Sequence, residues 1–91
     1  MDYRISRALE DLRRLLHGYV PTADDLAEAP LLDSWSLLGS NLLGRVSGHP
    51  TITDGHRCLT SVVLALAADH TWARTVIRFY RLGRPLWASF Q

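Results

Sequence analysis

The fold of this chain depends on one stretch in its C-terminal half, which reads Trp72-Ala73-Arg74-Thr75-Val76-Ile77-Arg78-Phe79-Tyr80-Arg81-Leu82. Its β-branched and aromatic side chains are the types that suit a pleated sheet surface. The spacing also fits a helix, because Trp72, Val76 and Tyr80 would share one face and the arginines would occupy the other. We predict a strand over residues 72–82 and keep the helix as the alternative.

Two further strands are expected before this stretch. Between Arg45 and Ile52 side chains alternate along the chain, which indicates a strand with one solvated face. Pro50 lacks an N–H for the sheet ladder, so this strand should lie at an edge. Asp54-Gly55 is a strong signal for a two-residue hairpin turn. We predict strands over residues 44–52 and 56–67, which form a three-stranded antiparallel β-meander with residues 72–82.

The N-terminal part is helical by its pattern. Apolar residues recur with a period near 3.6 up to Tyr19, and Gly18 and Pro21 supply a stop. Thr22 followed by Asp25 resembles a capping box. We predict helices over residues 2–17 and 23–29, the second ended by Pro30. The apolar segment 31–43 has no regular period and should lie against the sheet.

These elements predict a single α+β domain over residues 1–91, with the N-terminal helices packed on the three-stranded meander. If residues 61–69 and 71–82 were helices instead, the chain would be all-α, with a helix-turn-helix-like C-terminal half. The two models differ in function as well, because a helix bearing Arg74, Arg78 and Arg81 could enter a DNA groove.

Several short motifs carry a resemblance to a known family. They are the run from Pro21 to Trp35, Gly48-His49-Pro50, Thr60-Ser61, Trp72-Ala73-Arg74-Thr75 and Tyr80-Arg81-Leu82-Gly83. Together they resemble a family of short bacterial proteins known as a domain of unknown function, over roughly residues 12–85. The resemblance implies no activity and no catalytic residue. Small regulators that inhibit transcriptional activators on bacterial mobile genetic elements are similar to this chain in size, but no motif carries that analogy.

Composition and charge limit the classes of partner. The chain has 91 residues, of which 47% are hydrophobic and 21% charged, as in globular domains. A net charge of +1 is small for wholesale nucleic-acid binding. The charge is unevenly distributed, since residues 1–43 carry four arginines and seven acids, whereas residues 44–91 carry six arginines and two acids. This suits either an oriented interaction with a charged partner or mutual neutralisation of the two halves.

Cysteine usage and targeting signals indicate the compartment. Cys58 is the single cysteine, which excludes an internal disulfide and points to a reducing environment. The N-terminus opens without the apolar region of a signal peptide, and no apolar stretch approaches the length of a membrane span. We predict a cytoplasmic protein with no membrane association.

Catalytic and metal chemistry find little support in the sequence. His49, His56 and Cys58 are the nearest approach to a metal cluster, but zinc needs further ligands at suitable spacing. Cys58 beside His56 lacks a third group to orient the pair as a nucleophile and base. We predict no enzyme activity, no metal and no cofactor.

The arginines and aromatic residues of the C-terminal stretch are the candidate partner-binding surface. Guanidinium groups beside aromatic rings suit an acidic patch on another protein. The predicted site comprises Trp72, Arg74, Ile77, Arg78, Phe79, Tyr80 and Arg81. The alternative is that these arginines pair with Asp11, Asp24, Asp25 and Glu28 of the same molecule.

These observations predict a small non-enzymatic protein-interaction or regulatory module. Its more specific form is an antiactivator-like inhibitor of a bacterial transcriptional regulator. Apolar side chains on both faces of the predicted sheet make homodimerisation a natural outcome. The rival hypothesis is a minimal DNA-binding protein that uses its arginine-rich C-terminal element, and the near-neutral net charge disfavours it.

Overall fold

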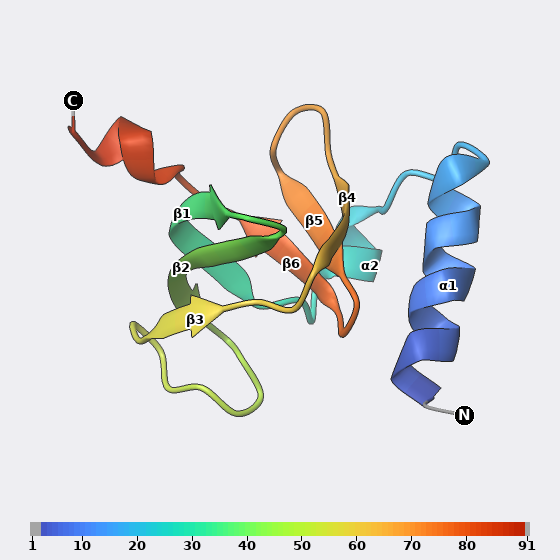
Figure 1. Ribbon diagram of the computed structural model, residues 1–91, viewed down its shortest axis with the longest axis horizontal. Coiled ribbons are helices and arrows are strands. Elements are labelled where there is room, and N and C mark those ends of the chain that lie inside the picture. The colour runs from blue at the N-terminus through green and yellow to red at the C-terminus, as the bar shows by residue number, and fades with distance from the viewer. Residues whose placement is uncertain (1–2, 91) are drawn as a thin grey trace.

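The computed structural model describes residues 3–90 and consists mainly of strands (Figure 1). The elements in chain order are α1 (Tyr3–Leu16), α2 (Ala23–Leu26), β1 (Leu31–Leu38), β2 (Asn41–Ser47), β3 (Arg57–Leu59), β4 (Val63–Leu66), β5 (Trp72–Thr75), β6 (Phe79–Leu82) and the 3₁₀-helix η1 (Leu86–Phe90). Among the described residues the strands form one six-stranded mixed sheet in the order β3-β2-β1-β6-β5-β4. Its neighbours are antiparallel except for β1 and β6, which are parallel.

The predicted fold is wrong in both of its forms. The chain builds a six-stranded mixed sheet, neither a three-stranded antiparallel meander under N-terminal helices nor an all-α bundle. Residues 72–82 form a hairpin, β5–β6, where we predicted one long strand or a helix. Thr75 closes this hairpin, because its N–H and its hydroxyl both donate to the carbonyl oxygen of Arg78, at 2.9 and 3.0 Å.

The earlier predicted strands also differ from those in the structure. The segment 31–43, expected to be irregular, supplies β1 and the start of β2, which turn at Gly39 with a φ of +62°. The predicted strand 44–52 ends at Ser47, and residues 48–56 form a loop closed by Asp54, whose carboxylate accepts from the Gly48 N–H at 2.8 Å. The predicted strand 56–67 is divided into β3 and β4.

The sheet closes on itself, because its two edge strands are consecutive in the chain. Only residues 60–62 separate β3 from β4. The Thr60 N–H donates to Leu42 of β2 at 2.8 Å, whereas Val62 accepts from the Val76 N–H, just after β5, at 3.0 Å. The backbone between the edges is thus bonded to both ends of the sheet, which curls into a barrel.

The hydrophobic core lies inside this barrel. It contains inward-facing side chains from five of the six strands: Leu32, Trp35, Leu42, Val46, Cys58, Ala73, Tyr80 and Leu82. Trp35 is oriented by its indole N–H, which donates to the Gly83 carbonyl at 3.0 Å. A core enclosed by strands does not need an amphipathic helix to cover it, and this is the physical reason why the predicted packing failed.

The helices lie outside the barrel. α1 lies within the predicted range 2–17, of which Asp2 is outside the described residues, and it stands against the β4–β5 side (Figure 1). It buries Ala8 but leaves Ile5, Leu9 and Leu16 exposed. α2 is a single turn, shorter than the predicted 23–29, and it begins with the Thr22–Asp25 capping box. Because α1 and α2 bury few side chains against the strands, a hollow remains between these helices and the β5–β6 hairpin.

Candidate functional site

A cleft of about 420 Å³ separates α1 and α2 from the β5–β6 hairpin. We call it the arginine cleft. Four arginines and three acidic residues line it, together with a few apolar side chains: Tyr3, Arg4, Arg7, Asp11, Asp25, Glu28, Ala29, Arg74, Ile77, Arg78 and Phe79. Its walls come from segments far apart in the sequence, so it exists only in the folded chain.

Arg74 forms the floor of the arginine cleft and is almost completely buried, with 3% of its surface exposed. One Nη donates to the Asp11 carboxylate of α1 at 3.0 Å, and the guanidinium carbon lies 5.1 Å from the centre of the Phe79 ring. The buried Nε has no hydrogen-bond partner among the described residues. Arg74 is therefore a buried cation with an unused donor.

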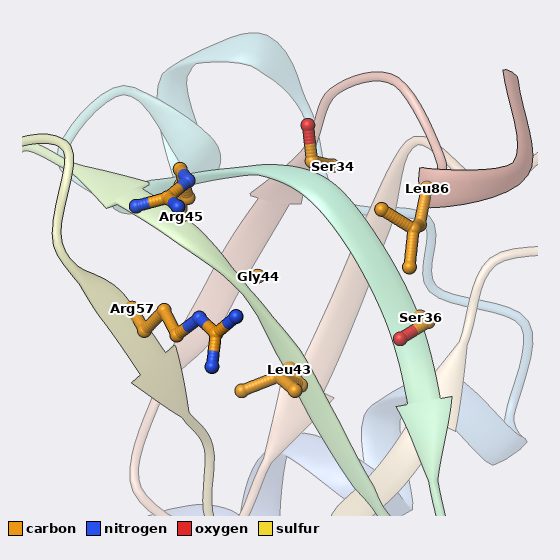
Figure 2. Close-up of a pocket in the computed structure, with 7 residues that line it drawn as sticks. All are labelled: Ser34, Ser36, Leu43, Gly44, Arg45, Arg57 and Leu86. Atoms are coloured by element: carbon orange, nitrogen blue, oxygen red, sulfur yellow. The ribbon is translucent and has the colours of Figure 1, made fainter. Parts of the chain in front are cut away.

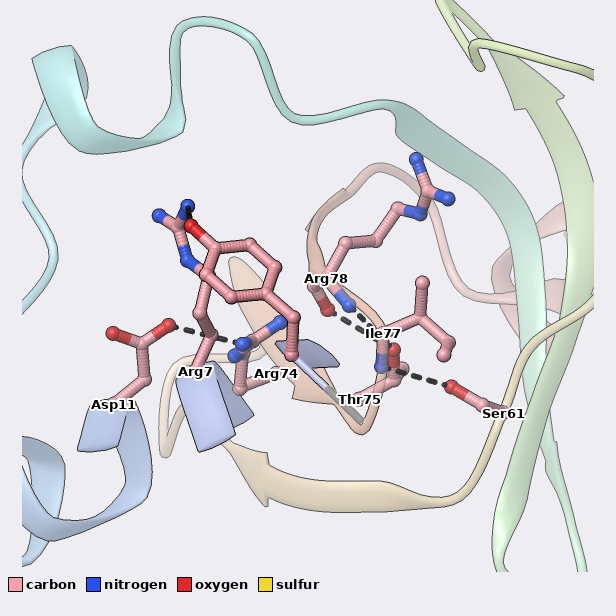
Figure 3. A network of polar contacts seen from close by, with 8 residues as sticks. Arg7, Asp11, Ser61, Arg74, Thr75, Ile77 and Arg78 are labelled. Carbon is pink, nitrogen blue, oxygen red and sulfur yellow. Dashed lines mark hydrogen bonds and ion pairs between the residues drawn. The ribbon is translucent and has the colours of Figure 1, made fainter. Parts of the chain in front are cut away.

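The electrostatics around Arg74 favour an additional negative charge. Burial is the main cause that lowers the pKa of Arg74, and the Asp11 carboxylate opposes this effect. The neighbouring cations Arg7 and Arg78 lower the pKa further. Figure 3 shows the Asp11 carboxylate pointing to Arg74 from α1, the Arg7 side chain next to it on the same helix, and Arg78 extending from the hairpin. Around Arg74, the carboxylate of Asp11 thus faces three guanidinium groups, those of Arg74, Arg7 and Arg78.

The tip of the β5–β6 hairpin holds Arg78 in place. The Arg78 N–H donates to the Thr75 hydroxyl at 3.2 Å, and the Ile77 N–H donates to the Ser61 hydroxyl at 3.3 Å (Figure 3). The Nε of Arg78, like that of Arg74, is buried without a hydrogen-bond partner among the described residues. On α1, Arg7 donates to the Tyr3 hydroxyl at 3.0 Å and lies against the Tyr3 ring.

The structure brings together four of the seven residues that the sequence indicated. Arg74, Ile77, Arg78 and Phe79 line the arginine cleft. Trp72 is half-buried and contacts Phe79 edge to face, with 5.9 Å between the ring centres.

Tyr80 and Arg81 lie away from the arginine cleft. Tyr80 is 4% exposed and faces the core, where its hydroxyl lies 3.8 Å from the Cys58 sulfur. Burial is the main cause that raises its pKa. The Nε of Arg81 donates to the Ala29 carbonyl at 2.9 Å. The hairpin explains the position of Tyr80, because it pairs Arg74 with Phe79 on one face and Ala73 with Tyr80 on the other.

Of the residues that α1 contributes to the cleft, sequence reasoning missed Tyr3, Arg4 and Arg7, and it named Asp11 only as a possible intramolecular partner of the arginines. Arg7 and Asp11 are spaced for a local i,i+4 pair on the helix, but Asp11 pairs with Arg74, far along the chain. This is the intramolecular pairing that the sequence left open, realised at one of the acids it indicated. Asp25 is occupied by its capping box and by the Tyr19 hydroxyl, which donates to its carboxylate.

A comparison with protein families places the chain. The model of a family of unknown function, DUF6634, matches residues 4–89. The chain belongs to this family. The resemblance seen in the sequence is thereby confirmed, and the family, DUF6634, brings no activity with it. No match was found among curated proteins or among solved structures.

The described part of this DUF6634 protein offers little for metal binding, nucleophilic chemistry or membrane insertion. Within residues 3–90, no three histidine, cysteine or acidic side chains gather closely enough to hold a metal ion. Cys58 is buried, whereas His56 is exposed, so the two do not share a face as the predicted hairpin would require. None of the helices in residues 3–90 has the length and apolar character needed to span a bilayer.

Proposed function

We propose that this protein is a small non-enzymatic interaction module whose arginine cleft binds an acidic segment of another protein. The observation that carries the proposal is the state of Arg74, which is buried, paired with a single carboxylate and left with an unbonded Nε. A buried charge costs free energy unless it is paired and fully hydrogen-bonded. A carboxylate from a partner would supply the missing acceptor.

The arginines of the cleft suit a carboxylate in geometry as well as in charge. A guanidinium group presents its donors in a rigid fork that matches the two oxygens of a carboxylate. Charge-assisted hydrogen bonds of this kind are about twice as strong as neutral ones. Arg7 and Arg78 lie beside Arg74 and can also interact with the negative charge of the partner's carboxylate. We infer that the partner presents one or more aspartate or glutamate side chains.

The apolar walls of the cleft suggest what surrounds that acidic residue. Ile77 and Phe79 are half-buried and line the same hollow as the arginines. Aromatic and arginine side chains commonly dominate the binding energy of protein interfaces. An acidic residue flanked by an aliphatic or aromatic residue would place its carboxylate on Arg74 and its neighbour on Phe79.

The more specific form of the proposal is regulatory. A binding module of this size can act in the bacterial cytoplasm by covering an acidic segment that a transcriptional regulator needs, which is antiactivator-like inhibition. The recognition helix of the rival hypothesis is wrong, because residues 72–75 and 79–82 are strands, whereas DNA binding by the arginine-rich element stays a prediction from the sequence. Homodimerisation stays a prediction from the sequence.

The test compares Arg78→Glu with a matched charge reversal outside the cleft. Arg13 serves as the control, since it is exposed on α1 and pairs with Glu10. The wild-type chain and both variants are immobilised, and proteins captured from a bacterial lysate are identified by mass spectrometry. We expect Arg13→Glu to retain a specific partner and Arg78→Glu to lose it. Binding of a synthetic peptide that spans the partner's acidic segment is then measured by fluorescence anisotropy, with a peptide carrying Gln for Glu as comparison. Equal affinity of wild type and Arg78→Glu for the acidic peptide would refute the proposal.

A further inference from the structure

A second pocket lies on the outer face of the barrel, apart from the arginine cleft. It has a volume of about 140 Å³ and is formed by β1, β2, β3 and the start of η1 (Figure 2). Its lining includes two arginines, Arg45 and Arg57, two serines, Ser34 and Ser36, and the apolar side chains of Leu43 and Leu86. None of the acidic side chains within residues 3–90 lines it.

The strand register puts the two arginines of this pocket side by side. Arg45 on β2 lies directly opposite Arg57 on β3 in an antiparallel pair, so both side chains project from the same face. Like charges in this position destabilise a sheet. Arg45 donates to the Gly55 carbonyl at 3.0 Å. Arg57 makes no hydrogen bond or ion pair with another residue in the described part of the chain.

Asp33 is next to Arg45 in the register of β1 but does not neutralise the pair. Its carboxylate accepts from the Arg84 N–H at 2.8 Å and forms no ion pair with either arginine within residues 3–90. The fold therefore keeps two adjacent cations on one face, and neither forms an ion pair with an acidic residue of the described chain.

A bulge in β1 adds the two serines. The register between β1 and β2 shifts between Asp33 and Ser36, and Ser34 has a φ of +50°. Trp35 turns into the core at the bulge, while the side chains of Ser34 and Ser36 line the pocket (Figure 2). Neither hydroxyl is hydrogen-bonded to another side chain or to backbone in residues 3–90, so both can donate to a ligand.

We propose that this pocket binds the phosphate group of a small phosphorylated molecule. Two guanidinium groups and two hydroxyls are donors that suit the three free oxygens of a phosphate monoester. A phosphate monoester carries close to two negative charges at neutral pH, which offsets Arg45 and Arg57 together. A carboxylate would bring one charge and two oxygens. Leu43 and Leu86 form an apolar wall for the organic part of the ligand.

The test measures thermal stability and binding with the full chain in a phosphate-free buffer of constant ionic strength. The probes are inorganic phosphate, phenyl phosphate and benzoate. We expect phenyl phosphate to raise the melting temperature and to bind saturably in calorimetry, with inorganic phosphate weaker and benzoate weakest. Benzoate binding as tightly as phenyl phosphate would contradict the choice of phosphate.

Arg57→Gln separates a binding role from a structural one. The variant should bind phenyl phosphate at least about tenfold more weakly, as expected for loss of a charge-assisted contact. Without ligand its melting temperature should be equal to or higher than that of the wild type, since a like-charge contact is removed. The control Arg13→Gln has the same net charge and should bind as the wild type does. Unchanged affinity of Arg57→Gln would overturn the proposal.

Two milder substitutions test the remaining contacts. Ser36→Ala removes one donor without changing charge and should weaken both phosphates. Leu86→Ala should weaken phenyl phosphate while leaving inorganic phosphate unaffected. If Ser36→Ala and Leu86→Ala both bind phenyl phosphate like the wild type, the ligand does not occupy this pocket and the proposal fails.

Discussion

The guanidinium of Arg74 on β5 lies 3.0 Å from the carboxylate of Asp11 on α1, and this ion pair fastens the helix to the barrel. Few other contacts do so, since Ala8 is the buried residue of α1, and Ile5, Leu9 and Leu16 face solvent. The same pair also forms the floor of the arginine cleft. The attachment of α1 and the proposed binding function therefore both depend on the positive charge of Arg74.

Asp11→Asn should destabilise the fold by about 2 kcal/mol, because it leaves the Arg74 cation buried without a counter-charge. The free energy of unfolding is measured by urea denaturation. In the double variant Asp11→Leu with Arg74→Met, most of the loss should be recovered, since an apolar pair of similar volume removes the buried charge. A stability of Asp11→Asn equal to that of the wild type would show that the ion pair does not secure α1.

Stability should decrease in mild acid through His49. The Nδ1 of His49 accepts from the backbone N–H groups of Thr51 and Ile52, at 3.1 and 3.2 Å, which requires Nδ1 to be unprotonated. Burial, and then the Arg78 charge, lower the pKa of His49 below its ordinary value of 6.5. The unfolded chain thus binds the proton more readily than the folded chain. The contribution of His49 is fully present above pH 6.5 and is lost as the pH falls through its lowered, folded-state pKa.

Urea midpoints at pH 7.5 and at mildly acidic pH test this linkage. His49→Asn should flatten the dependence, because asparagine can accept a hydrogen bond but does not titrate. The exposed His56 provides the control, and His56→Asn should leave the pH dependence as it is in the wild type. Should His49→Asn keep the full dependence, another group would be responsible for it.

Gly44→Ala should cost about 3 kcal/mol, because the added methyl group overpacks the junction between β1 and β2. A Cβ at Gly44 would lie 2.8 Å from the Asp33 carbonyl oxygen and 2.8 Å from the Leu32 Cγ. The control is Gly39→Ala in the β1–β2 turn, where φ is +62° but nothing lies within 4 Å of the new methyl. That change should cost only about 1 kcal/mol of backbone strain. Urea denaturation compares the two, and a larger loss for Gly39→Ala would be inconsistent with close packing at the bulge.

Thr75→Val should destabilise the β5–β6 hairpin with little change in volume. The completely buried Thr75 hydroxyl donates to the Arg78 carbonyl and accepts from the Arg78 N–H. Loss of these bonds should cost about 2 kcal/mol, since buried polar groups are left without partners. Amide hydrogen exchange of Arg78 should also accelerate relative to that of Leu82. Wild-type exchange at Arg78 would show that the hydroxyl does not hold the turn.

The parts of the fold that could be predicted are those with local causes. The capping box of α2 depends on neighbouring residues and is present. Asp54-Gly55 does form a turn, in which the His56 N–H donates to the Thr53 carbonyl at 3.1 Å, but it lies within the loop 48–56, and the predicted two-residue hairpin is wrong. The turn between β5 and β6 could not be recognised in the sequence, since it contains no glycine, proline or asparagine. The side chain of Thr75 closes it instead. The closure of the barrel could not be predicted either, since it depends on hydrogen bonds between residues far apart in the sequence: Thr60 with Leu42, and Val76 with Val62.

The residues of the candidate site also fall into two groups: those that a local sequence pattern indicates and those that only the folded chain brings together. Arg74 and Arg78 could be singled out from the sequence because an arginine-rich aromatic stretch is visible locally. Asp11 could be named only as one of four acids able to pair with these arginines, because only the folded chain brings α1 to β5. Tyr80 resembled a surface anchor because a single long strand would have placed it beside Arg74. Because the β5–β6 hairpin reverses the chain, Tyr80 faces the core instead.

The parallel pairing of β1 with β6 has a consequence for synthesis on the ribosome. Leu31 and Leu32 meet Arg81 and Leu82, so the first strand of the barrel waits for the last one to emerge from the exit tunnel. Contacts between such distant segments slow folding, because loop-closure entropy is lost before they form. Until Leu82 is available, the nascent chain carries an unpaired sheet edge on β1, and such an edge can pair with another chain.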